Sequence, residues 1–243
     1  SGDAWDTSSV TNFTDVFSGC TNFNSSVDHW NVSAGTDFTY MFYACAAYQQ
    51  SMSSWSFKQS GTINMTGMFD GGCVAFNQDI GNWNTEYVTN MAQLFSGASI
   101  FTNGGASLTE AGNNWDVQRV TNMANMFKGS AFNVACGDWN TAAVTTMDSM
   151  FESVTEFNQD ISDWNTAAVT NMKEMFKFAS SFDQDINTDG NKWNTAAVTN
   201  MYNMFAYTSF NRDISDWNTA IVTNMQQMFY GNSAYNQPMA TDG

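Results

Sequence analysis

The chain has 243 residues, of which 43% are hydrophobic and only 12% are charged. Seven Lys and Arg residues stand against 23 Asp and Glu residues, and the formal net charge is −16 at pH 7. This balance excludes the clustered basic residues on which binding to nucleic acids and anionic membranes depends. No run of about 18 apolar residues occurs, so the sequence predicts no membrane-spanning helix.

One segment recurs from end to end, and its copy at residues 160–176 reads DISDWNTAAVTNMKEMF. Each of the nine tryptophans occupies the same place in one copy, at spacings of 24 to 32 residues. Such a period is typical of arrays in which each unit buries its apolar side only against its neighbours. The sequence therefore predicts a single domain over residues 1–243, whose coils start near Trp5, Trp30, Trp55, Trp83, Trp115, Trp139, Trp164, Trp193 and Trp217.

The pattern within one repeat predicts two short elements. Trp164 and Thr166 flank Asn165, and this alternation predicts a strand with the Asn side chain directed outward. The apolar residues from Val169 to Phe176 lie at positions i, i+3, i+6 and i+7, which predicts a short helix with one buried side. The predicted fold class is a repeat solenoid, specifically a leucine-rich-repeat-like β/α solenoid of nine coils, each with a short parallel strand and a short helix.

The methionines follow the same register as the tryptophans. Fourteen of the 16 methionines occupy two equivalent positions in the repeats, and Met52 and Met239 take the place of Ile161. We therefore expect every methionine to lie in the core.

The pattern FNQDISDWNTAAVTNMxxMF, at residues 157–176 and in a close variant at residues 210–229, resembles the repeat of BspA-like leucine-rich-repeat surface proteins. It is similar, more narrowly, to a Met- and Trp-rich branch first noticed in mycoplasma lipoproteins. The resemblance covers nearly the whole chain. It implies a leucine-rich-repeat-like solenoid at a cell surface or outside the cell, and it implies no particular activity.

Three cysteines, Cys20, Cys45 and Cys73, follow the Met-Phe pair in consecutive repeats. Stacked coils would bring their Cα atoms to about 5 Å from one another, a separation that a disulfide accepts. Two alternatives stay open: one pair forms a disulfide, or all three are small buried residues. Cys136 replaces the equivalent of Ile161 and is predicted to be a core thiol. The spacing typical of metal ligands is absent, since there is no Cys-x-x-Cys and only one His.

Four Asn-x-Ser/Thr sequences make candidate glycosylation sites in the first three repeats, at Asn12, Asn24, Asn31 and Asn64. Such triplets also arise by chance in a repeat rich in Asn and Thr.

The polar residues on either side of each tryptophan form two rows, and exposed rows of this kind are the usual binding surface of repeat arrays. Their oxygens suit a glycan, a protein ligand or Ca²⁺, and no other cofactor is expected. The alternative is that the rows serve solvation and hydrogen bonds between repeats. The candidate binding face consists of Asn84, Asp116, Asn140, Asn165, Asn194, Asn218, Asp138, Asp163 and Asp216.

Catalytic residues do not stand out. The only histidine, His29, occupies a position that other repeats fill with Asp or Asn, and the acids recur as a feature of the repeat. Acid–base catalysis needs one distinctive site, so we do not expect an enzyme.

The termini suggest self-association. The tail from Tyr235 to Gly243, placed before Ser1 to Trp5, resembles residues 185–193, so we expect the array to continue in a longer chain or to stack head to tail. The chain begins at Ser1 without a visible signal peptide, and we expect a processed chain or a segment. The leading hypothesis is a non-enzymatic extracellular or cell-surface structural and adhesive protein whose partners are itself or other extracellular proteins and glycans. The alternative is a soluble binding module that uses the candidate binding face.

Overall fold

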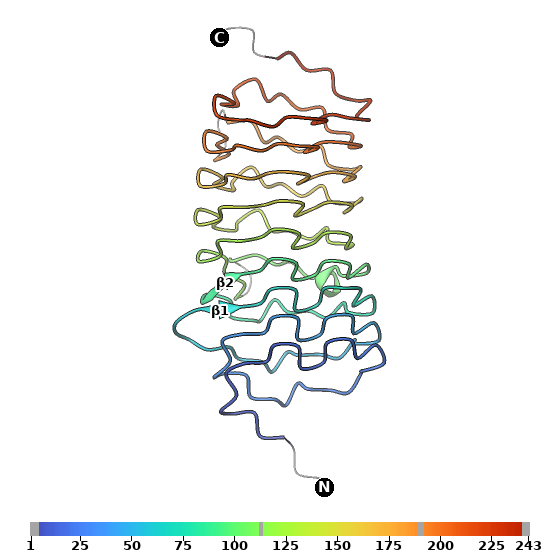
Figure 1. Cartoon of the computed structure of the whole chain (residues 1–243), viewed down its shortest axis with the longest axis vertical. Helices are drawn as coiled ribbons and strands as arrows, with labels where there is room; N and C mark the ends of the chain where they lie inside the picture. The colour runs from blue at the N-terminus through green and yellow to red at the C-terminus, as the bar shows by residue number, and fades with distance from the viewer. Residues whose placement is uncertain (1–4, 112–113, 189–191, 240–243) are drawn as a thin grey trace.

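The computed structural model describes residues 5–111, 114–188 and 192–239. Figure 1 shows the chain wound into a column of layers, with the N-terminal layer at one end and the C-terminal layer at the other. We number the layers 1 to 9 by their tryptophans, so that layer 1 contains Trp5 and layer 9 contains Trp217.

The predicted fold class is wrong. In the described ranges there is no α-helix, and the strands are β1 (Ile63–Asn64) and β2 (Val88–Asn90), which pair in parallel in one sheet. A 3-10 helix, η1, spans Asn103–Gly105. The strand and helix expected in every coil of a leucine-rich-repeat-like β/α solenoid are therefore not formed by the residues that the structure describes.

Neighbouring layers pair elsewhere than predicted. The parallel contacts lie at an equivalent residue of each layer, such as Asn171, which directly precedes Met172. In most layers this residue comes five positions after the Thr of the predicted Trp-x-Thr strand. Outside β1 and β2, each contact is a bridge between single residues. The bridges join, in order, Asn12, Asp37, Asn64, Asn90, Asn122, Thr146, Asn171, Asn200 and Asn224.

The hydrogen bonds explain why no helix forms after this bridge. In layer 5, the N–H groups of Met123, Asn125 and Phe127 donate to carbonyls of layer 6, at 3.1, 2.7 and 3.1 Å. The intervening Met126 N–H donates to the Met123 carbonyl at 3.2 Å and closes a β-turn. A helix would keep all these N–H groups for its own carbonyls four residues back. Here every second N–H group bonds to the next layer instead.

These turns need a left-handed backbone. Asn125, the third residue of the turn, has a φ of 57°, as in a type II turn. The same sign of φ recurs at the equivalent residues Asp15, Tyr40, Gly67, Gln93, Ser149, Glu174, Asn203 and Gln227. A spacing of i and i+3 thus comes from repeated turns and not from a helix.

A continuous aromatic core runs through the layers. Nine phenylalanines, one from each layer, stack with centroid separations of 5.3 to 5.9 Å: Phe17, Phe42, Phe69, Phe95, Phe127, Phe151, Phe176, Phe205 and Phe229. The tryptophans also bond across layers, as when Trp164 Nε1 donates to the Cys136 carbonyl at 3.0 Å. Thr166, predicted to face inward, is buried and donates to the Asn194 carbonyl at 2.9 Å.

The expectation for the methionines is confirmed for all but two, which both lie in the last layer. Fourteen of them are buried, whereas Met225 is 43% exposed and Met239 is 54% exposed. For these two the prediction is wrong, because no described layer covers the C-terminal side of layer 9.

Candidate binding face

The two predicted polar rows lie on one side of the column, beside the tryptophans. In eight of the nine layers the residue after the tryptophan is Asn or Asp, and its side-chain oxygen accepts the N–H two residues on, as at Asp6 and Asn31; layer 3 has Ser56 at this position. Asn165 accepts from Ala167 at 3.1 Å, and Asn194 accepts from Ala196 at 2.9 Å. The same bond forms at Asn84, Asp116, Asn140 and Asn218. The side-chain oxygens thus shape the turns of their own layers.

Hollows lie along this face. One, of about 430 Å³, is lined by Asp138, Asn140, Asp163, Asn165 and Lys192, together with Trp139 and Thr141. A second, of about 210 Å³, is lined by Asn84, Glu86, Glu110, Asn114, Trp115 and Asp116. The structure therefore gathers six of the nine candidate residues around two hollows, and Asn194, Asp216 and Asn218 continue the rows in layers 8 and 9.

The carboxylates of this face form hydrogen bonds and an ion pair with other groups of the same chain. Asp138 accepts from the N–H groups of Glu110 and Ala111, at 3.0 and 2.9 Å. Asp163 pairs with Lys192 at 3.3 Å. Asp216 accepts from the Asn187 amide at 3.2 Å. Among the described residues no group of three or more His, Cys, Asp and Glu side chains could hold a metal ion.

Glu110 is a residue of this face that the sequence did not single out. Its carboxylate accepts from the Asn140 N–H at 2.8 Å and from the Val117 N–H at 3.4 Å, and so joins two layers. Partial burial raises the pKa of Glu110 above its ordinary value. Its only signal in the sequence is its place in the longest interval between tryptophans.

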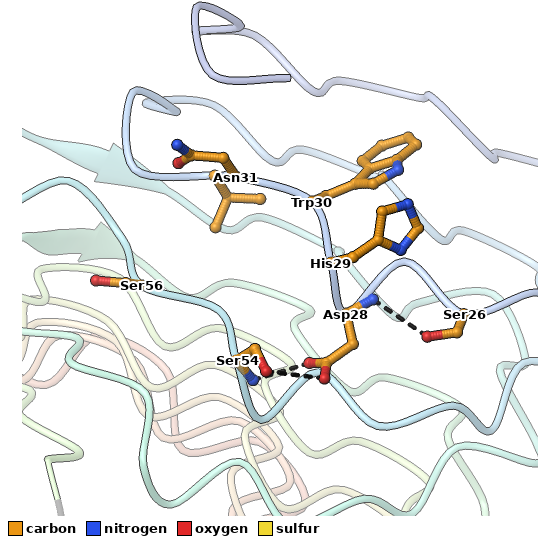
Figure 2. Close-up of a pocket in the computed structure, with 8 residues that line it drawn as sticks. Ser26, Asp28, His29, Trp30, Asn31, Ser54 and Ser56 are labelled. Carbon is orange, nitrogen blue, oxygen red and sulfur yellow. Dashed lines mark hydrogen bonds between the residues drawn. The ribbon is translucent and has the colours of Figure 1, made fainter. Parts of the chain in front are cut away.

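A third hollow, of about 500 Å³, includes His29 in its lining (Figure 2). The other lining residues are Ser26, Asp28, Trp30, Asn31, Val32, Ser54 and Ser56. Asp28 accepts from the N–H and the hydroxyl of Ser54, at 2.8 and 2.9 Å. The Asp28 N–H donates to the Ser26 hydroxyl at 3.3 Å. Figure 2 shows the His29 ring beside Trp30, with no hydrogen bond to the other residues drawn. These groups do not form the relay that a nucleophilic serine requires.

The four cysteines are free thiols. Cys45 and Cys73 are buried and donate to the carbonyls of Phe17 and Phe42, at 3.0 and 2.8 Å, whereas Cys20 is exposed. Burial raises the pKa of Cys45 to about 11 and that of Cys73 to about 12. The structure therefore has small buried thiols at two of the three positions and no disulfide. Cys136 lies in the core, where burial raises its pKa.

The candidate glycosylation sites differ in exposure. Asn12 and Asn31 are exposed. Asn24 is half-buried, and its oxygen accepts from the Gln49 N–H at 3.1 Å. Asn64 is also half-buried, and its amide nitrogen, the atom that would carry a glycan, donates to Thr39 at 2.9 Å. Asn12 and Asn31 thus have the more accessible acceptor nitrogens.

Another group that the sequence did not single out is a ladder of ion pairs across layers 5 to 7. Glu152 pairs with Lys128 at 2.8 Å and with Lys177 at 3.7 Å. Lys177 pairs also with Glu174 at 2.7 Å, and Glu174 pairs with Lys173 at 3.3 Å. Lys128, Glu152 and Lys177 stand 13 residues after successive tryptophans, so comparing this position along the repeats would have revealed the alternation of charge.

Both end layers expose apolar side chains. In layer 1, a hollow of about 400 Å³ is lined by Trp5, which is 73% exposed, and by Phe17, Phe23, Val27 and Trp30 among others. In layer 9, a hollow of about 370 Å³ is lined by Trp217, Met225, Phe229 and Met239 among others. Residues 1–4 and 240–243, on which the predicted match between the two termini depends, lie outside the described residues.

No helix of the described residues is long and apolar enough to cross a membrane. No curated protein and no solved structure shows significant similarity to the chain. One family model matches, described as "Mycoplasma protein of unknown function, DUF285", and its four matches cover residues 3–72, 56–112, 103–191 and 186–242. The matched family agrees with the mycoplasma part of the resemblance and leaves the leucine-rich-repeat part unsupported. The chain belongs to this mycoplasma repeat family of unknown function.

Proposed function

We propose that the chain is a non-enzymatic structural and adhesive repeat protein, placed outside the cell or on its surface, that stacks end to end through its terminal layers. The observation that carries the proposal is the pair of apolar hollows at the two ends of the column. Trp5 and Met225 are 73% and 43% exposed there, whereas their counterparts in the interior layers are buried. Stacking would remove this apolar surface from water.

A place outside the cell is supported by the surface composition and by the resemblance to BspA-like surface proteins. The described surface is rich in uncharged Asn, Thr and Ser, and the net charge of −16 favours solubility and disfavours anionic membranes. A role without catalysis is supported by the side-chain rows, because the same Asn and Asp bonds recur in eight of the nine layers.

The test of stacking is negative-stain electron microscopy together with light scattering over a range of protein concentrations. We expect filaments whose mass grows with concentration. Met225→Asp places a charge on the end face, and it should abolish filaments. Ala167→Asp adds the same charge on the exposed side of layer 7, and it should leave them intact. Monomers at every concentration, or equal effects of the two substitutions, would contradict end-to-end stacking.

A second candidate function is a binding module, favoured by the hollow that Asp138, Asn140, Asp163 and Asn165 line beside Lys192. Carboxylate and amide groups of this kind recognise the hydroxyl groups of a glycan. The test is binding of the protein to an array of oligosaccharides. If the chain is a binding module, a subset of the oligosaccharides should bind selectively. This binding should weaken in Asp163→Asn and persist in Asp15→Asn, which changes an acid of layer 1. If the protein bound no oligosaccharide, the proposal that this face binds glycans would be contradicted.

A further inference from the structure

The hydrogen bonds between layers have a direction. From layer 5 to layer 6, the N–H groups of Met123, Asn125, Phe127 and Gly129 donate at 3.1, 2.7, 3.1 and 2.8 Å. The same four positions donate from layer 1 to layer 2, at 2.7 to 3.0 Å, and from layer 8 to layer 9, at 2.8 to 3.1 Å. The threonine before the bridge reverses the direction, as when the Thr223 N–H donates to the Thr199 carbonyl at 2.9 Å. Outside this segment a few other N–H groups also donate to the preceding layer, such as those of Ala47 and Ser181, each at 3.0 Å. Each layer is thus mainly a donor to the layer that follows it.

This direction makes the two ends of the column different. Layer 9 presents the N–H groups of Met225, Gln227, Phe229 and Gly231, and none of them has an acceptor among the described residues. Layer 1 presents the carbonyls of residues 12, 14, 16 and 18, and none of these has a donor within the same ranges. One end therefore offers a row of donors, and the other end offers a row of acceptors with the same spacing along the chain.

Resting on the proposed stacking, we infer that the partner of layer 9 is layer 1 of a second copy, docked in the register that continues the ladder. The N–H groups of residues 225, 227, 229 and 231 then donate to the carbonyls of residues 12, 14, 16 and 18 of the second copy. The Thr11 N–H of the second copy donates to the Thr223 carbonyl. This pairing repeats the bonds that join layer 8 to layer 9.

The side chains fit the same register. Phe229 stacks on Phe205 at 5.6 Å, and Phe17 stacks on Phe42 at 5.3 Å, so each end presents one open ring of the phenylalanine column. In the inferred register Phe17 of the second copy lies over Phe229. Trp217 donates its indole N–H to the Ile186 carbonyl at 3.0 Å, and Trp5 of the second copy would donate to the Ile214 carbonyl in the same way.

The register also decides the symmetry of the assembly. Two copies joined through their C-terminal layers would oppose N–H groups to N–H groups, and two copies joined through their N-terminal layers would oppose carbonyls to carbonyls. Neither arrangement pairs the exposed backbone groups. Head-to-tail contact satisfies both rows, leaves a free end on each copy and does not close, which makes a filament.

Disulfide trapping tests the register. In a Cys20→Ser background, Thr11→Cys and Thr223→Cys place two cysteines in neighbouring positions of the inferred junction, about 5 Å apart between Cα atoms, as a disulfide requires. After mild oxidation we expect a ladder of covalent multimers that a reducing agent abolishes. The control pair, Ser25→Cys with Thr223→Cys, puts the first cysteine at another part of layer 1, and it should give monomers.

The outcomes separate the register from the stacking itself. Filaments with a ladder from the 11/223 pair alone support the inferred register. Filaments without that ladder, or with equal ladders from both pairs, overturn the register and leave end-to-end stacking in place. If the unsubstituted protein is monomeric at all concentrations and the 11/223 pair gives no ladder, both the register and the proposed stacking fail.

Discussion

A left-handed position that every layer shares allows a sharp test of the turn architecture. Gly129 and Ser153 are equivalent residues of layers 5 and 6, with φ of 66° and 62°. Five of the nine layers have glycine at this position, namely Gly19, Gly71, Gly97, Gly129 and Gly231. A Cβ atom at Gly129 would meet nothing within 4 Å, so Gly129→Ala changes the backbone preference without a clash.

The magnitude follows from two opposing effects. A left-handed backbone costs an L-residue about 1 to 2 kcal/mol. The lower entropy of the unfolded chain offsets about 0.4 to 1 kcal/mol of that cost. Gly129→Ala should therefore lower the free energy of unfolding by about 1 kcal/mol. Ser153 is exposed, and Ser153→Gly should raise the free energy of unfolding by about 0.5 to 1 kcal/mol.

Urea unfolding, followed by tryptophan fluorescence, measures both changes as shifts of the midpoint. Ala167→Gly is the control, since Ala167 is exposed and does not have a positive φ. There glycine should destabilise by about 0.5 to 1 kcal/mol. The reasoning would be refuted if Gly129→Ala left the midpoint unchanged, or if Ser153→Gly lowered it as much as Ala167→Gly.

Three more predictions concern the core, the ion-pair ladder and the thiols. Trp164→Phe removes the donor to the Cys136 carbonyl and should lower the free energy of unfolding by about 1 to 3 kcal/mol, as measured by urea unfolding. Trp5→Phe, at the exposed end of the column, should change the free energy of unfolding little. Partial burial acts to raise the pKa of Glu174, but hydrogen bonds from Lys177, Asn203 and Lys173 outweigh it and hold that pKa below its ordinary value. The stabilisation from Glu174 should therefore be complete above the ordinary pKa of a glutamate, and it should disappear as the pH falls through the lowered pKa of Glu174. Glu174→Gln should thus lower the free energy of unfolding at pH 7 and change it little at strongly acidic pH. A maleimide should label Cys20 in the native protein within minutes. It should label Cys45 and Cys73 only after unfolding, because those two thiols are buried and their pKa values are raised. Equal labelling rates for all three thiols would contradict the structure.

The repeat and the identity of the core were readable from the sequence. Trp164, Met172 and Phe176 are rare and bulky residues in constant register, and such residues are costly to expose, so their burial follows from composition alone. The exceptions, Trp5, Met225 and Met239, lie in the end layers, where no described neighbour covers them. Six of the nine residues of the candidate binding face line two hollows, because the two rows flank the tryptophans in the repeat.

The secondary structure was not readable, because one apolar spacing serves two architectures. Met172 and Met175 are three residues apart, which suits one side of a helix and equally suits the first and last residues of a β-turn. The choice depends on the Glu174 N–H, which donates to the Tyr202 carbonyl at 2.8 Å, in the next layer. No periodicity within a single repeat reports a partner 28 residues away.

By itself the sequence determined the period of the array, the side chains that are buried and the polar rows that flank them, since these depend on the chemistry of each residue and on its regular recurrence. Only the tertiary structure decided the path of the backbone between those side chains. A backbone N–H bonds whichever acceptor the packing brings within reach, and here the stacked layers bring the next layer's carbonyls within hydrogen-bonding distance, at 2.7 to 3.1 Å between layers 5 and 6. The direction of those bonds, and with it the difference between the two ends of the column, exists only once the layers are stacked.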